Sequence, residues 1–250
     1  MRQVNFFDIL APSAPAKETD VSALIAKLTH NCRECRLGQT TDRGNQGFLC
    51  AGPIEAKIAI LGDMPEVGGH TLTKHLPLYG PALGLLKMWL IQVSIDPDTV
   101  FLLNTVQCKT TKVGKAGEDP REPYDDEVDL CFPSRALRVL KALPNLEIVI
   151  TLGWLAASVL LGKFPTPRPK THEGAWFGTD VLPNVAIFCL DHPRSITPED
   201  VRHLGRCEQY MEYLRSEYLR PDPAHPGRKP KILDILAYRQ KGRNAQRQHD

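Results

Sequence analysis

The chain has no apolar run long enough to cross a membrane and no segment with the plan of a secretion signal. Its longest apolar stretch, residues 148–162, is shorter than a membrane span and is interrupted by polar residues and glycine. The first apolar run, VNFFDIL, contains Asp8 and leads into proline-rich sequence, unlike a signal peptide. We therefore expect a cytoplasmic protein with no membrane partner.

The sequence also has little excess charge and lacks the common nucleotide-binding loops. Its 31 Lys and Arg residues nearly balance its 29 Asp and Glu residues, so a net charge of +2 does not by itself indicate nucleic-acid binding. The first predicted strand is followed by neither GxGxxG nor a Walker loop, which argues against ordinary dinucleotide or triphosphate binding. The 250 residues have ordinary globular composition and suit one medium-sized domain with appendages.

Short apolar runs predict the core of the fold. They are continuous rather than alternating, as expected for parallel strands covered on both faces, and they lie at residues 57–62, 100–106, 148–153 and 185–190. Amphipathic stretches between and after them predict helices at residues 82–93, 125–143, 155–161 and 199–219. This alternation predicts an α/β fold: a three-layer α/β/α sandwich with a central, mainly parallel four-stranded sheet.

The two ends of the chain differ in composition from this central part. We expect a flexible leader at residues 1–20, the folded domain at 21–219 and a basic, Pro-containing tail at 220–250. The tail carries eight Lys or Arg residues against three Asp, so it either contacts DNA phosphates or is a solvated tail. Within it, KILDILAY (231–238) is expected to form a short helix that docks on the domain.

Seven cysteines in a protein expected in the cytosol call for an explanation other than disulfides. Cys32 and Cys35 form a CxxC pair. Cys108 follows the second predicted strand, and Cys131 lies further along the chain. Four thiolates suit either a zinc ion or a [4Fe–4S] cluster, since soft sulfur ligands bind both. The alternative is a chance CxxC pair with the other thiols packed in the core.

The three other cysteines do not join this pattern; they are Cys50, Cys189 and Cys207. Cys189 lies inside a predicted strand, where a thiol serves as a small apolar residue. We therefore expect Cys189 to be buried.

Polar residues follow the predicted strands at their carboxyl ends. Asp63 follows the first strand, Asn104 lies near the end of the second, and His192 follows the last. In parallel α/β sheets ligands bind at these ends, so we expect the three side chains to share one rim. Each also has a structural alternative: Asp63 as a helix or turn cap, Asn104 bonded to backbone in the core, and His192 as a structural residue before proline.

The order of short motifs along residues 30–215 resembles the iron–sulfur uracil-DNA glycosylases of families 4 and 5, and Asp63 favours family 4. The stretches that carry the resemblance follow the CxxC pair and are GDMP (62–65), PLYGPALGLL (77–86), NTVQC (104–108), EDPREP…DLC (118–131), VITLGWLAASVLLG (149–162), HEGAWFG (172–178) and DHPRSI (191–196).

The resemblance implies a role for each matching residue. Asp63 would position water or stabilise a positively charged sugar, His192 would stabilise negative charge on uracil O2, and Asn104 would bind the uracil edge. Other residues would line the base pocket: Gly62, Met64, Leu78 and Tyr79. A structural [4Fe–4S] cluster would be held by Cys32, Cys35, Cys108 and Cys131. We expect DNA contacts from residues after the His-Pro pair and from the basic stretch after residue 108, namely Arg194, Ile196, Lys109 and Lys112.

The resemblance therefore implies a DNA-repair glycosylase that hydrolyses the N-glycosidic bond of uracil flipped out of DNA. The sequence departs from the family at Leu78, where an aromatic residue usually stacks on the base, and the family's Leu wedge is not evident after His192. These departures motivate an alternative: a weak or inactive glycosylase-fold accessory protein of replication or recombination. A third reading is a zinc-stapled nucleotide-binding domain. We expect a monomer that binds DNA, with replication or repair proteins as possible partners of the tails.

Overall fold

The computed structural model describes residues 20–28, 32–40, 50–65, 76–114, 117–162, 176–196, 201–215 and 232–233. For residues 39–40, 111–114, 117–120, 201–203 and 232–233 it describes the backbone alone. Most of the expected leader and tail therefore lies outside the described residues.

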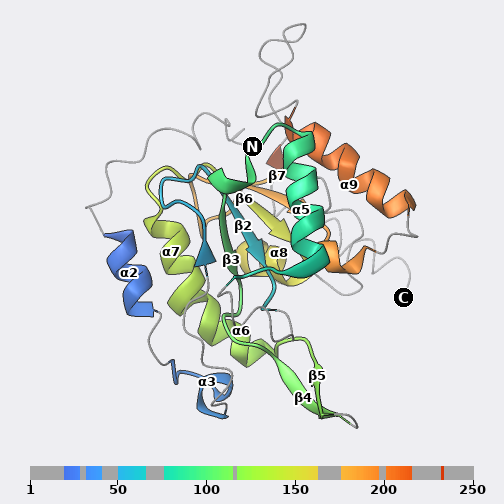
Figure 1. Cartoon of the computed structure of the whole chain (residues 1–250). Helices are drawn as coiled ribbons and strands as arrows, with labels where there is room; N and C mark the ends of the chain where they lie inside the picture. The colour runs from blue at the N-terminus through green and yellow to red at the C-terminus, as the bar shows by residue number, and fades with distance from the viewer. Residues whose placement is uncertain are drawn as a thin grey trace, which may run out of the picture.

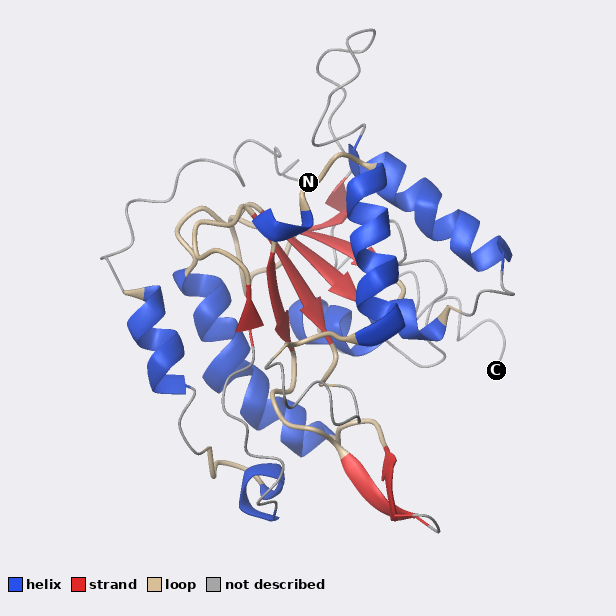
Figure 2. Ribbon diagram, viewed as in Figure 1, coloured by secondary structure: helices blue, strands red, loops and turns tan. Residues whose placement is uncertain are grey.

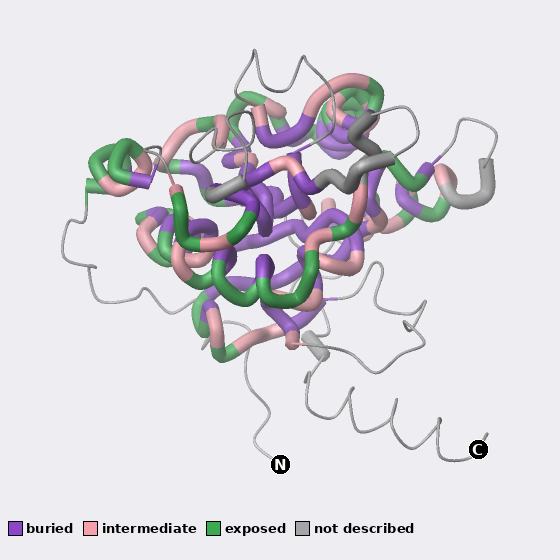
Figure 3. Tube along the Cα trace, turned by 90° about the horizontal axis from the view of Figure 1, so that it is seen from below, coloured by how far each residue is buried: buried purple, intermediate pink, exposed green. Residues whose placement is uncertain are grey.

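One sheet forms the centre of the fold, and its four middle strands are those that the apolar runs predict. These strands are all parallel, in the order β3 (Phe101–Asn104), β2 (Ile58–Gly62), β6 (Ile148–Leu152) and β8 (Ala186–Leu190). All residues of β2, β6 and β8 are buried, which explains their unbroken apolar sequences. Figure 3 shows that the buried residues gather at the centre of the molecule.

The sheet has seven strands rather than the four expected. Two-residue strands extend it on both sides: β1 (Cys50–Ala51) pairs antiparallel with β3, β7 (Trp176–Phe177) pairs antiparallel with β8, and β9 (Ile232–Leu233) pairs parallel with β7. Such short strands show no period in a sequence. Residues 232–233 thus form a strand and not the short helix expected there.

Helices cover both faces of the sheet, which confirms the predicted three-layer sandwich (Figures 1 and 2). On one face α5 (Gly80–Gln92) and α9 (Val201–Leu214) share an apolar cluster with Ile58 and Ile60 of β2. On the other face α2 (Val21–Leu28), α7 (Leu137–Ala142) and α8 (Gly153–Leu161) share a second cluster with Ala59 and Leu61 of the same strand. Alternate residues of each strand therefore belong to two separate cores.

The predicted helix at 125–143 is interrupted in its middle. It consists of α6 (Asp125–Cys131), a π-helical segment at Phe132–Ala136 and α7. Pro133 has no backbone N–H to donate to the preceding turn, which explains the interruption. Cys131 is thereby the last residue of α6, immediately before the π-helical segment.

Two further elements lie where no regular structure was expected. The segment between Cys108 and α6 contains an antiparallel hairpin of β4 (Thr111–Gly114) and β5 (Gly117–Pro120), which projects from the body in Figure 2. The CxxC pair runs into the short helix α3 (Arg36–Thr40). Among the described helices, none is long and apolar enough to span a bilayer.

Candidate functional site

The sheet order brings the expected polar residues to one rim. Asn104 ends β3 and pairs in register with Gly62, the last residue of β2. Asp63 follows Gly62 directly, and His192 follows β8 by one residue. Between β2 and β8 lies β6, whose end passes into α8 at Gly153. Because the four strands are parallel neighbours, these residues all lie at the carboxyl edge.

The Asn104 amide lies directly above the backbone of Gly62. A β-carbon on Gly62 would stand only 2.5 Å from Oδ1 of Asn104, so a side chain there would collide with the amide. The other end of the amide is also held, since Nδ2 donates to the carbonyl of Pro77 at 2.7 Å. Asn104 is 2% exposed. The amide is thus fixed in one orientation by its surroundings.

Asp63 and His192 meet at Gly153. A β-carbon on Gly153 would lie 3.2 Å from Asp63 Oδ2 and 3.2 Å from the His192 β-carbon. Gly153 has a φ of +87°, a conformation that residues with a side chain rarely adopt. The Asp63 carboxylate and the base of the His192 side chain can therefore both lie against Gly153 because this position has no β-carbon.

The Asp63 carboxylate also caps a helix. Its Oδ1 accepts a hydrogen bond from the backbone N–H of Ala156, in the first turns of α8, at 3.1 Å. The positive end of the helix dipole and this N–H both favour a charged carboxylate. The capping alternative and the rim position are therefore compatible, although the capped helix is not the next one along the chain but one 93 residues away.

His192 is buried and neutral. It is 7% exposed, and burial, with a smaller contribution from the charge of Arg194, lowers its pKa from 6.5 to about 4. Its Nδ1 accepts a hydrogen bond from the backbone N–H of Arg194 at 3.1 Å. A neutral imidazole whose Nδ1 is an acceptor carries its proton on Nε2. His192 is therefore a hydrogen-bond donor through Nε2.

The four cysteines of the predicted ligand set border one pocket, which we call the thiol pocket. Its volume is about 340 Å³, including space open to solvent. It is lined by Cys32, Cys35, Cys108 and Cys131, together with Gln107 and Arg135 among others. Among the described residues, no three His, Cys, Asp or Glu side chains are arranged as a ready site for a metal ion.

Two of these thiols, Cys108 and Cys131, are not stable as thiolates on their own. Burial, followed by the proximity of the other cysteines, raises the pKa of Cys108 to about 12. Burial also raises the pKa of Cys131 to about 11. The chemistry of the set nevertheless fits a thiolate-bound metal centre. The backbone N–H of Gln107 donates to Cys131 Sγ at 3.4 Å, and the cationic Arg135 is buried beside the thiols.

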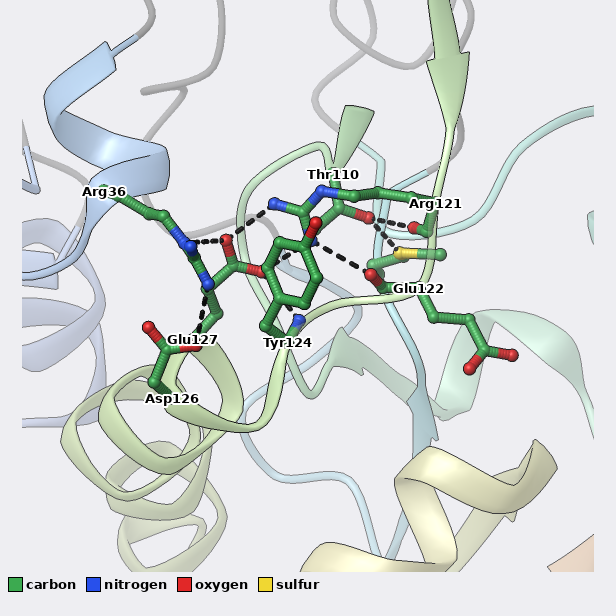
Figure 4. A network of polar contacts seen from close by, with 8 residues as sticks. Arg36, Thr110, Arg121, Glu122, Tyr124, Asp126 and Glu127 are labelled. Carbon is green, nitrogen blue, oxygen red and sulfur yellow. Dashed lines mark hydrogen bonds and ion pairs between the residues drawn. The ribbon is translucent and has the colours of Figure 1, made fainter. Parts of the chain in front are cut away.

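A buried carboxylate joins the cysteine-bearing segments (Figure 4). Glu127 of α6 is fully buried and accepts hydrogen bonds from Arg36 Nε at 2.8 Å and from Arg121 at 2.6 and 2.8 Å. It also caps its own helix through the backbone N–H of Tyr124. Burial alone would raise the pKa of Glu127, but these hydrogen bonds outweigh it and lower the pKa. We call Arg36, Arg121, Tyr124 and Glu127 the carboxylate clamp.

Further contacts within the clamp and beside it strengthen it. The guanidinium groups of Arg36 and Arg121 lie 4.3 and 4.0 Å from the centre of the Tyr124 ring, within cation–π range. Within the CxxC pair, Glu34 accepts a hydrogen bond from Ser134 at 2.8 Å. These contacts tie the CxxC segment and α3 to α6, the helix that ends in Cys131.

The other predicted site residues occupy different environments. Met64 is buried, and its sulfur accepts a hydrogen bond from Thr110 Oγ1. Tyr79 is half-buried at the start of α5. Leu78 and Ile196 are 4% and 8% exposed and belong to the core under α5 and α9. In this structure these two side chains are therefore core residues, with little surface left for a base or for DNA.

The predicted DNA contacts divide in the same way. Arg194 is exposed and lies beside His192 in the short 3₁₀ helix Pro193–Ser195. Lys109 is half-buried, and Lys112 lies on β4, where the structure describes the backbone alone. Cys189 is fully buried in β8, as expected.

Sequence reasoning did not single out four residues that shape these sites; they are Gly153, Glu127, Gln107 and Arg135. A glycine at the junction of a buried strand and a helix indicates a positive φ, so the special conformation of Gly153 could have been predicted from the sequence. Glu127 lies among other acidic residues, and Arg135 resembles any helical Arg. Nothing in the local sequence marks either of them as buried.

Comparison with protein families is consistent with this geometry. The family model described as the uracil DNA glycosylase superfamily matches residues 50–215, more than half of the chain. The matched range contains Asp63, Asn104 and His192, and it begins after the CxxC pair. A search among curated proteins gave no match.

Proposed function

The chain belongs to the uracil DNA glycosylase superfamily, and on that premise we propose that it hydrolyses the N-glycosidic bond of uracil flipped out of DNA. The observation that carries this proposal is the rim around Gly62 and Gly153. There a carboxylate, a neutral imidazole donor and a fixed amide lie at the carboxyl ends of three parallel strands of one sheet, β2, β8 and β3.

The chemistry of bond cleavage matches the two groups at Gly153. As the bond breaks, positive charge develops on the sugar and negative charge on the departing base. Asp63, oriented by α8, would stabilise the sugar or hold the attacking water, and His192 would donate its Nε2 proton in a hydrogen bond to uracil O2. A neutral His192 keeps a full hydrogen bond for this purpose without bringing a buried positive charge into the free enzyme.

The fixed Asn104 amide accounts for base selection. An amide presents an acceptor and a donor together, which match N3–H and O4 of uracil but oppose the acceptor and amine of cytosine. One N–H of Asn104 is used by the Pro77 carbonyl, so the amide cannot rotate to present the opposite pattern without losing that hydrogen bond. A base must leave the stack to reach such a buried group, at a cost of a few kcal/mol.

We further propose that the thiol pocket holds a [4Fe–4S] cluster, with zinc as the alternative. Four cysteines, an N–H donor to sulfur and the buried Arg135 support a thiolate centre of net negative charge. Such a centre supplies a structural staple between the CxxC segment and the domain. It takes no part in the chemistry at the rim.

One observation favours the alternative of an accessory protein with little activity. Leu78 stands where the family usually has a stacking aromatic residue, and it is buried in the core. A base would then lose aromatic stacking of roughly 1–3 kcal/mol unless Tyr79 replaces it. The activity assay separates the two functions.

The test incubates purified protein with single- and double-stranded oligonucleotides that contain one uracil, followed by alkali to cleave abasic sites. We expect strand cleavage by the natural protein and its loss, by at least about 100-fold, in His192→Ala and Asn104→Ala. Both variants should keep the metal content and the melting profile of the parent. A natural protein that leaves every uracil substrate intact but still binds DNA would establish the accessory function instead.

The metal assignment has a test of its own. Purified protein with a cluster should absorb broadly near 400 nm and contain iron and sulfide, whereas a zinc protein should be colourless. Replacing Cys131 with serine should remove the metal. Replacing Cys189 with serine should leave it in place, because Cys189 lies in β8 and outside the thiol pocket.

A further inference from the structure

A five-residue turn, Asn104–Cys108, joins the rim to the thiol pocket. It begins with the amide above Gly62 and ends with a cysteine of the pocket. Along its length the backbone N–H groups of Thr105 and Val106 donate to the carbonyls of Gly62 and Asp63, at 2.8 and 2.9 Å. The turn is thus fastened to the residues that carry the Asp63 carboxylate.

Gln107 contacts both ends of this connection. It is 1% exposed, and its Nε2 donates to the backbone carbonyl of Asn104. Its own backbone N–H donates to Cys131 Sγ, and the residue lines the thiol pocket. A single buried residue therefore contacts the backbone of Asn104 on one side and a predicted metal ligand on the other.

We propose that Gln107 is a positioning residue that holds Asn104 in register for uracil, with the thiol pocket as its fixed point. Asn104 is the last residue of β3, so the position of its carbonyl depends on hydrogen bonds made outside the strand. The Pro77 carbonyl holds the Asn104 side chain, and Gln107 holds its backbone. Both restraints are needed to hold the amide where it can form hydrogen bonds with a base.

This inference rests on the proposed glycosylase function and adds a specific consequence to it. Losing the Gln107 hydrogen bond should loosen the amide while Asp63 and His192 stay in place. Uracil binding and the preference for uracil over cytosine should weaken, whereas the chemistry of a correctly bound uracil should change less. We therefore expect KM to rise more than kcat falls.

The test is a double-mutant cycle between positions 107 and 104. Gln107→Met keeps length and volume but removes the donor, and we expect kcat/KM on uracil DNA to fall about tenfold. In an Asn104→Ala background the same change should alter kcat/KM by less than twofold, because the amide that Gln107 positions is gone. Gln92→Leu, an exposed glutamine at the end of α5, is the control and should match the parent.

Metal content, the melting temperature and uracil-DNA affinity complete the design. Equal losses in the parent and Asn104→Ala backgrounds would assign Gln107 a structural role and overturn the inference, as would full activity in Gln107→Met. If Gln107→Met loses the metal, Gln107→Asn, which keeps an amide, serves as the second variant. If the parent neither cleaves nor binds uracil DNA, the proposed function is overturned as well. If the parent binds uracil DNA without cleaving it, the same double-mutant cycle is measured with dissociation constants in place of kcat/KM.

Discussion

The rim and the thiol pocket lie at the same edge of the sheet but are held by different means. The rim depends on backbone: strand register pairs Gly62 with Asn104, and Gly153 lets Asp63 and the base of the His192 side chain both lie against it. The pocket depends on side chains that reach between distant parts of the chain, such as Arg36 to Glu127 across 91 positions. The sheet builds one site, and a network of charges builds the other.

The difference has consequences for how each site fails. A rim fixed by buried strands tolerates few changes in shape, because each group lies against a neighbour's backbone. The pocket should instead be sensitive to the balance of charge, because Glu127 and Arg135 are buried ions. Substitutions that change side-chain shape at the rim, and substitutions that change charge at the clamp, therefore test whether the two sites are held by different means.

The largest effect should come from adding one methyl group to the rim. In Gly153→Ala the new β-carbon would stand 3.2 Å from both Asp63 and the His192 side chain, at a φ that alanine rarely adopts. We expect a loss of at least about 100-fold in uracil excision, close to 3 kcal/mol, with about 1 kcal/mol of stability lost to backbone strain. The rate of alkali-sensitive site formation and urea denaturation measure the two effects.

Gly84→Ala is the matched control. Gly84 lies inside α5, and a β-carbon there would have open space around it. Alanine favours a helix interior, so this variant should be as active as the parent and slightly more stable. Metal content should be unchanged in both variants. If Gly153→Ala released the metal, the two sites would not be separately built.

The second effect concerns the pH dependence of stability. His192 is neutral and buried, and its pKa is lowered from 6.5 to about 4. Between these values the unfolded chain binds a proton that the folded chain does not, so stability is lost as pH falls from 6.5 to 4. The shift corresponds to about 3 kcal/mol. Urea denaturation of the parent and His192→Gln across this range isolates the contribution.

The informative quantity is the difference in unfolding free energy between the parent and His192→Gln at each pH, because all other groups titrate in both proteins. His192→Gln should lose less stability than the parent on acidification, and the gap should stop growing below about pH 4. Parallel curves would mean that folding does not lower the pKa of His192. The proposal that burial keeps His192 neutral would then be wrong.

The two sites also differ in how far the sequence predicts them. The rim follows from patterns in the sequence. Buried runs mark the strands, parallel order aligns their ends, and Asp63, Asn104 and His192 lie at those ends or within two residues of them. Gathering of the four cysteines at one pocket was predicted, but the means of holding them was not. Glu127 is one of three consecutive acidic residues, and only the packing of α6 decides which of them is buried.

The limits of sequence reasoning are clearest at Leu78 and Ile196. Motif position assigned them to the base and to DNA, but helix α5 and helix α9 cover both with core. The residue type of an apolar position next to a functional motif does not show whether its side chain faces a ligand or the protein interior. The packing angle of the neighbouring helices decides this, and the local sequence does not encode that angle.

The third effect tests the charge balance of the clamp. Glu127→Gln keeps the shape of the side chain but leaves Arg36 and Arg121 facing a neutral amide, so we expect a loss of about 2 kcal/mol. Metal should also be released more readily to a chelator, because α3 is less firmly tied to α6. Glu212→Gln, which breaks the exposed pair with Arg215 on α9, should change neither quantity measurably. An unaffected Glu127→Gln would show that the metal centre alone holds the pocket.

The smallest effect is expected at the opposite edge of the sheet. Lys57 and Glu147 form an ion pair of 2.9 Å just before β2 and β6, at the amino ends of the strands, and the Lys57 side chain is 70% exposed. Exposed pairs contribute little, so Lys57→Met should change stability by at most about 0.5 kcal/mol. Its uracil excision and metal content should equal those of the parent, because both sites lie at the carboxyl edge. A tenfold loss of excision in Lys57→Met, with stability intact, would place part of the DNA-binding surface at the amino edge and break the assignment of function to the rim.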